Sequence, residues 1–178
     1  PGTSLLHGAT GSGKTEVYLR HIQHALEQTP EAQVLVMVPE INLTPQLEQQ
    51  VRERFHHLGS SAVVSLHSGL TPAQRLNHWM DAHAGLARII LGTRLSIFAS
   101  LPHLKLIVVD EEHDPSFKQS DGPRHSARDL AVFRGHQLGI PVVLVSATPS
   151  LESWNNSEAQ GRKAAYQRID MPSRQGNQ

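Results

Sequence analysis

The stretch Gly8-Ala9-Thr10-Gly11-Ser12-Gly13-Lys14-Thr15 decides the expected fold. It fits the phosphate-binding loop pattern of glycine, four residues, glycine, lysine and serine or threonine. In such loops backbone N–H groups surround the phosphates of a nucleotide, and glycines allow the positive φ angles that this requires. Apolar residues before the loop predict a strand, and apolar residues at helical spacing after it predict a helix whose positive dipole end faces the phosphates.

Each residue type in this phosphate loop (residues 8–15) has a chemical task. Lys14 can place a charge between the β- and γ-phosphates of ATP, and the Thr15 hydroxyl can bind Mg²⁺. We therefore expect nucleotide contacts from Gly8, Thr10, Gly11, Ser12, Gly13, Lys14, Thr15 and Glu16. The alternative is a plain glycine turn between a strand and a helix.

Length and composition narrow the class of protein. The 178 residues are 38% apolar, enough for one substantial core and too few for two full-sized domains. Lysine plus arginine and aspartate plus glutamate both number 16, so a nucleic-acid surface would have to be local. With no cysteine, signal peptide or long apolar run, we expect a soluble cytoplasmic protein without a membrane partner.

Short apolar runs alternate with helical segments, which predicts an α/β fold with a mainly parallel central sheet and helices on both faces. The expected strands are residues 4–7, 34–38, 63–66, 89–92, 106–110 and 142–146. Thr44-Pro45, Thr71-Pro72 and Ser126 predict helix starts, and Gly139 predicts a helix end. Trp79 and Phe133 are expected in the core because they lie on apolar helical stripes.

The chain is expected to contain one globular domain over residues 1–154. Residues 155–178 are more polar and are expected to form an extension or linker, with residues 166–169 as a possible edge strand. The last residues, 171–178, have too few apolar side chains to pack as a core.

A second polar cluster, Asp110-Glu111-Glu112-His113, follows an apolar strand. Asp110 could hold Mg²⁺ through water, and Glu111 could polarise the water that attacks the γ-phosphate, with Glu112 as the next candidate for that role. Lys14, Asp110 and Glu111 are therefore the expected catalytic residues.

Ser146 and Thr148 lie at the end of another apolar strand. Their hydroxyls could therefore form hydrogen bonds with the acidic cluster and sense the phosphate. The alternative for this segment is a capping turn in which Ser150 starts a helix.

Six motifs occur in the order of the superfamily 2 helicase motifs. They are residues 8–18, 38–46, 66–70, 92–94, 110–114 and 146–150. The chain resembles in particular the first RecA-like lobe of the PriA family of bacterial replication-restart helicases. The resemblance implies a three-layer RecA-like P-loop NTPase domain in which the strand ending at Ser146 lies between the phosphate-loop strand and the acidic strand. It further implies a DNA-dependent ATPase that moves 3′ to 5′ on single strands and serves primosome assembly at abandoned forks.

The resemblance also assigns residues to DNA contact and to its coupling with hydrolysis. These are Pro39, Thr44, Gln46, Thr93, Arg94, His113, Phe117, Lys118, Arg128, Ser146 and Thr148. Residues 114–128 match the family's aromatic-rich loop, in which Phe117 would stack on bases and Lys118, Arg124 and Arg128 would contact phosphates. The alternatives are a solvated loop with Phe117 tucked onto the domain, and a surface salt bridge for Arg94.

Partners are likewise implied by the resemblance. They are single-stranded and forked DNA, single-strand binding protein, other replication-restart proteins, and a second helicase lobe of the same protein that supplies arginines. Zinc is expected only in a part of the protein beyond this chain, and the location is expected to be the bacterial cytoplasm at the nucleoid. Competing possibilities are a nucleotide-gated DNA- or protein-binding module without motor activity, and a lobe of another superfamily 2 ATPase.

Overall fold

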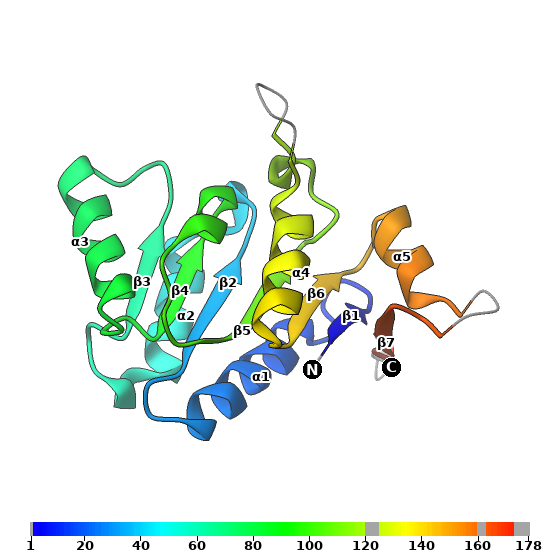
Figure 1. Ribbon diagram of the computed structural model, residues 1–178, viewed down its shortest axis with the longest axis horizontal. Coiled ribbons are helices and arrows are strands. Elements are labelled where there is room, and N and C mark those ends of the chain that lie inside the picture. Colours follow the sequence, from blue (N-terminus) through cyan, green and yellow to red (C-terminus); the bar gives the residue numbers. More distant parts are fainter. Residues whose placement is uncertain (1, 120–124, 160–162, 173–178) are drawn as a thin grey trace, which may run out of the picture.

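A computed structural model describes residues 2–119, 125–159 and 163–172 of the chain. Within these residues seven strands form one parallel sheet (Figure 1) in the order β3-β4-β2-β5-β6-β1-β7. The strands are β1 (Thr3–His7), β2 (Gln33–Met37), β3 (Val63–Leu66), β4 (Ile89–Gly92), β5 (Leu104–Asp110), β6 (Val142–Ser146) and β7 (Tyr166–Asp170). The predicted position of β6 between β5 and β1 is confirmed.

Helices cover both faces of this sheet, which confirms the expected three layers. The α-helices are α1 (Lys14–Gln28), α2 (Pro45–Arg54), α3 (Pro72–His83), α4 (Ala127–Leu138) and α5 (Leu151–Ser157). Short 3-10 turns are η1 (Glu40–Asn42), η2 (His56–Leu58), η3 (Arg94–Phe98) and η4 (Pro115–Phe117). The predicted caps are present: the Thr44 hydroxyl accepts from the Leu47 amide, Thr71 forms a capping box, and Gly139 ends α4 with φ 64°.

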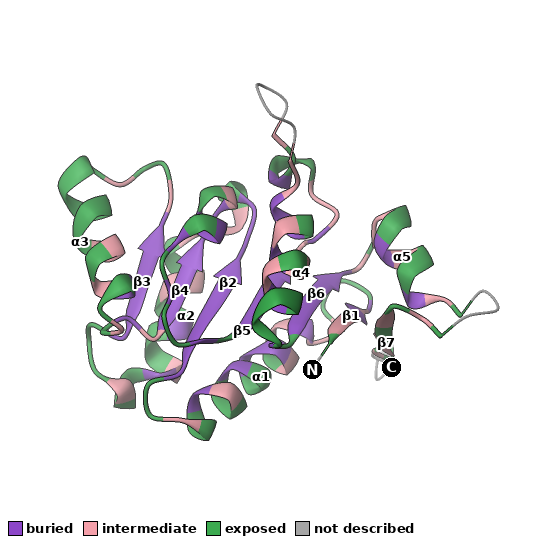
Figure 2. Ribbon diagram, viewed as in Figure 1, coloured by how far each residue is buried: buried purple, intermediate pink, exposed green. Residues whose placement is uncertain are grey.

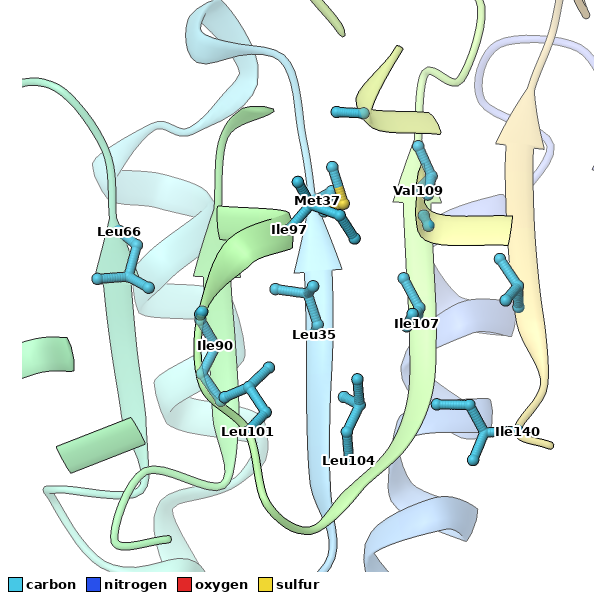
Figure 3. Packing of buried hydrophobic residues seen from close by; sticks show 14 of the residues in the cluster. Leu35, Met37, Leu66, Ile90, Ile97, Leu101, Leu104, Ile107, Val109 and Ile140 are labelled. Atoms are coloured by element: carbon cyan, nitrogen blue, oxygen red, sulfur yellow. The ribbon is translucent and has the colours of Figure 1, made fainter. Parts of the chain in front are cut away.

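The core consists of two apolar layers, one on each face of the sheet. Alternate residues of β2 and β5 point to opposite faces, so that Leu35 and Ile107 pack toward α3, η3 and α4 (Figure 3) while Val36 and Val108 pack toward α1 and α2. Figure 2 shows the central strands buried almost throughout and the helices exposed on their outer sides. This is the pattern of a parallel sheet that is covered on both faces.

One core prediction was wrong and another was confirmed in part. Phe133 is 61% exposed, because the side of α4 that faces the sheet carries small residues, including Ala127, Ala131 and Gly135. A Cβ on Gly135 would lie 2.2 Å from a methyl of Val142, so α4 packs closely on β6 and Phe133 lies on its outer side. Trp79 is half-buried and packs against the core.

The polar C-terminal segment contributes to the sheet. β7 pairs in parallel with β1, from Thr3 opposite Tyr166 to His7 opposite Asp170, which confirms the edge strand. The domain boundary expected after Trp154 falls inside α5. Among the described residues no helix is both long and apolar enough to cross a membrane.

Candidate active site

The phosphate loop connects β1 to α1 and has the shape of an anion cradle. Gly11 and Gly13 adopt φ angles of 79° and 90°, which favour glycine. A Cβ on Gly8 would lie 2.7 Å from the Ser12 hydroxyl and 2.9 Å from the Met171 Cβ, so a larger residue here would require both side chains to move. No side chain caps the start of α1, and the Ser12 hydroxyl is buried without a hydrogen-bond partner among the described residues. The uncapped backbone amides at the start of α1 and the Ser12 hydroxyl are therefore available to bind the phosphates of a nucleotide.

Lys14 lies inside this cradle. Its Nζ donates hydrogen bonds to the backbone oxygens of Gly8, at 2.7 Å, and Ala9, at 2.8 Å, and the residue is buried. A buried ammonium requires negatively polarised partners, and phosphate oxygens provide stronger ones than carbonyls do. Thr15 follows in the first turn of α1.

The acidic strand ends close to this loop, because β5 and β1 are separated only by β6. The Tyr18 hydroxyl donates to Asp110 Oδ2 at 3.2 Å, and the Glu111 amide donates to Oδ1 at 2.9 Å. Burial, and then the nearby Glu111 charge, raise the pKa of Asp110 to about 6. A bound divalent cation would favour the ionised carboxylate.

The sequence does not predict the contact of Tyr18 with Asp110, because Tyr18 also fits the apolar helical spacing that follows the phosphate loop. Burial raises the pKa of Tyr18, so the hydroxyl remains a hydrogen-bond donor to Asp110. The available signal was its residue type, since a buried tyrosine hydroxyl generally finds a polar partner.

Glu111 and His113 form a polar chain toward β6. Glu111 has φ 50°, a left-handed conformation that is strained for a side chain of this kind. Its Oε2 lies 3.4 Å from His113 Nε2, and His113 Nδ1 lies 2.6 Å from the Ser146 hydroxyl. The Ser146 hydroxyl also accepts from the Thr148 amide at 2.9 Å. The predicted contact between the residues at the end of β6 and the acidic cluster is therefore present, through Ser146.

The Glu112 carboxylate is used in a buried hydrogen-bond network, so it is a poor candidate for the base that activates water. It is 1% exposed, and its carboxylate accepts from the Ser150 amide at 2.7 Å and from the Ser153 hydroxyl at 2.9 Å. Arg128 Nη1 donates to the same carboxylate at 3.3 Å. Ser150 also caps α5, as the alternative for this segment predicted.

Among the residues expected to contact DNA, the side chains of Phe117 and Arg128 are buried in contacts within the domain, and for Phe117 this is the alternative in which the ring is tucked onto the domain. Phe117 is 1% exposed and packs in the core with Ile97 and Ala127, because the turn η4 folds back over the sheet. Arg128 is 5% exposed and its guanidinium is held by Glu112 and Asp129. Neither can stack on a base or reach a phosphate in this conformation.

The remaining residues of the coupling loop are placed only in part. Lys118 is exposed and available to solvent. Arg124 lies outside the described residues.

The side chain of Glu16, an expected nucleotide ligand, is held by arginines. The Glu16 carboxylate pairs with Arg54 and Arg20, at 3.0 Å in each case, and therefore turns away from the loop. Only its backbone amide, in the first turn of α1, is left to face a phosphate. Thr10 lies exposed on the loop.

The strand ends expected to hold DNA lie on the other half of the sheet. Pro39 is buried, Thr44 uses its hydroxyl for the α2 cap, and Gln46 is exposed beside it. Thr93 is buried at the start of η3. Arg94 Nη1 donates to the Lys118 carbonyl at 3.3 Å, and its Nε is buried without a hydrogen-bond partner in the described part of the chain.

Comparisons with known proteins agree with this site. The family model for DEAD/DEAH box helicases matches residues 3–156. The chain is 46% identical to the replication restart protein PriA of Haemophilus influenzae, over 97% of this chain and 22% of that protein. It is 42% identical to PriA of Bacillus subtilis, over 96% of this chain and 20% of that protein. The solved structure of helicase MrfA bound to DNA matches with a TM-score of 0.63 at 19% identity, over 95% of this chain and 25% of that one.

The chain thus spans about a fifth of the length of the curated relatives it matches. The PriA resemblance is confirmed over this lobe, and the structural match agrees with the RecA-like fold. The family uses a nucleotide, and the phosphate loop has the donors to bind one. This chain belongs to the DEAD/DEAH box helicase family.

Proposed function

We propose that this chain is the ATP-binding motor lobe of a 3′-to-5′ DNA helicase that acts in replication restart and primosome assembly. The observation that carries this proposal is the approach of Lys14 and the Asp110–Glu111 pair at one sheet edge, in a chain 46% identical to PriA. Single-stranded and forked DNA are the substrates. Replication-restart proteins and single-strand binding protein are partners by family resemblance, in the bacterial cytoplasm at the nucleoid.

The residues at the phosphate loop would hold ATP with Mg²⁺. The loop's free backbone amides and Lys14 would surround the phosphates, and Thr15 and Asp110 would hold the cation. When bound, the cation would supply charge neutralisation at the phosphates. Glu111 orients a water molecule and accepts its proton. Arginines from a second lobe complete the site, and any zinc site belongs to the rest of the protein.

DNA contact is proposed for the strand ends on the other half of the sheet. Thr93 and Arg94 follow β4, and the α2 N-terminus at Thr44 and Gln46 follows η1. The acidic cluster is linked to β6 by hydrogen bonds among His113, Ser146 and Thr148. Through these bonds the bound nucleotide could change the position of the neighbouring loops.

The test is DNA-stimulated ATP hydrolysis by the full-length protein. Glu111→Gln keeps the side-chain shape but removes the base, so it should bind ATP and hydrolyse it about 100-fold or more slowly. Lys14→Ala should weaken nucleotide binding itself. Glu31→Gln, at an exposed turn away from the loop, is the matched control.

Near-normal turnover of Glu111→Gln would remove Glu111 from this role. Nucleotide and DNA binding by the unmodified protein without stimulated hydrolysis would favour the binding-module alternative.

A further inference from the structure

A cavity of about 440 Å³ lies at the carboxyl edge of the sheet, on the half away from the phosphate loop. Its lining comes from the segments that follow four adjacent strands: Ser68 after β3, Arg94 after β4, Glu40 after β2 and Ser116 after β5. Arg75 and Trp79 of α3 complete the wall. The size is in the range of small-ligand pockets.

We propose that this cavity receives one unpaired nucleobase of the bound DNA strand, with Trp79 as its stacking surface. This inference rests on the proposed function and goes beyond backbone contact by the strand ends. It assigns a binding role to Trp79 and Arg75, which sequence analysis did not connect with DNA.

The walls of the cavity suit the flat apolar face of a base. Trp79 is half-buried, so the core holds one part of its ring while another part lines the cavity. Leu66 is buried at the end of β3, and Leu95 lines the cavity although it is 58% exposed. Stacking on an aromatic side chain tolerates any base, since every base has a π-face.

Charges around the cavity favour a base inside and a phosphate near the arginines. In the described part of the chain Arg94 donates one hydrogen bond, from Nη1 to the Lys118 carbonyl at 3.3 Å, and Arg75 donates one, from Nη2 to the Ser68 carbonyl at 3.5 Å. Both guanidiniums therefore retain donors for a phosphate. Glu40, which accepts from the Ser68 hydroxyl at 3.1 Å, adds a negative charge to the lining and disfavours a phosphate there.

A base bound in this cavity would affect the end of β5 through the short loop that follows this strand. Ser116 lines the cavity, and its amide donates to Asp114 Oδ1 at 2.8 Å. The Asp114 amide donates to the Glu111 carbonyl at 2.9 Å. Phe117, buried beside Ser116, anchors this turn to the core. A base against Ser116 therefore acts on the loop that holds Glu111.

The test uses the full-length protein and single-stranded oligonucleotides that carry 2-aminopurine at successive positions. Stacking on Trp79 should quench the fluorescence at one position, and Trp79→Leu should remove that quenching. An abasic site at that position should weaken binding about 5- to 150-fold in the unmodified protein, and Trp79→Leu should remove most of this difference. Phe133→Leu, an exposed aromatic on α4 that does not line the cavity, is the matched control and should keep both signals.

Arg75→Ala provides a second variant at an exposed position. It should weaken the binding of intact and abasic DNA by similar factors, because it removes a phosphate contact and leaves the stacking surface. Quenching and an abasic penalty that persist in Trp79→Leu, or no abasic penalty in the unmodified protein, would overturn the base pocket while leaving the motor function intact. A failure of the protein to bind single-stranded DNA would overturn both.

Discussion

Asp110 is the residue at which function and stability are most clearly opposed. Its carboxyl is largely buried beside Glu111, and these two causes raise its pKa from an ordinary 3.8 to about 6. The native state therefore binds a proton at Asp110 more tightly than the unfolded chain does. The contribution to stability is present below pH 3.8 and is lost as the pH rises through about 6.

Asp110→Asn should therefore stabilise the protein at pH 8 in magnesium-free buffer. The expected gain in the free energy of unfolding is at most about 3 kcal/mol, since one pKa unit corresponds to about 1.4 kcal/mol. At pH 4.5 the gain should be much smaller, because Asp110 is then mostly protonated. Urea unfolding with a chelator at both pH values measures this. A gain of equal size at the two pH values would show that ionisation of Asp110 is not its cause.

Phe117 is predicted to act through packing rather than base stacking. Phe117→Ala should lower the free energy of unfolding by about 3 to 5 kcal/mol, the usual cost of removing a buried phenyl ring. Phe133→Ala should change it by less than about 0.5 kcal/mol, because Phe133 is exposed. Urea unfolding of both variants provides the measurement. Unchanged stability with lost DNA stimulation in Phe117→Ala would restore the stacking assignment.

At the scale of elements, the Glu112–Arg128 pair joins the end of β5 to α4, and Ser150 and Ser153 extend the network to α5. Arg128→Met leaves Glu112 buried without its cation and should cost about 3 to 5 kcal/mol of stability. Adding Glu112→Gln removes the unpaired charge and should recover part of that loss. The coupling energy from urea unfolding of the single and double variants tests this. Strictly additive losses would show that the pair does not interact.

At the scale of the whole molecule, the proposed function places part of the ATP site on a second lobe. The isolated 178-residue chain should bind nucleotide with Mg²⁺ weakly and show little DNA-stimulated hydrolysis. The physical reason is that arginine stabilisation from a second lobe is worth on the order of a thousandfold or more in rate. Comparing steady-state hydrolysis by the isolated chain and by the full-length protein checks this. DNA unwinding by the isolated chain would contradict it.

The amino-acid sequence by itself determined the features that local patterns encode. The phosphate loop, the alternation of strands and helices, and the caps at Thr44 and Thr71 each depend on residues that are neighbours in the chain. The place of β6 between β5 and β1 came from family resemblance and was confirmed by the sheet.

Tertiary structure alone decided which polar and aromatic side chains are accessible. Arg128 and Lys118 both looked like DNA contacts, yet Arg128 is buried against Glu112 while Lys118 is exposed. Phe117 lies in the core and Phe133 outside it, the reverse of their predicted places. Residue type and spacing report which side chains can bury or bind. Burial itself depends on packing between segments far apart in the sequence, such as the close contact of Gly135 with β6.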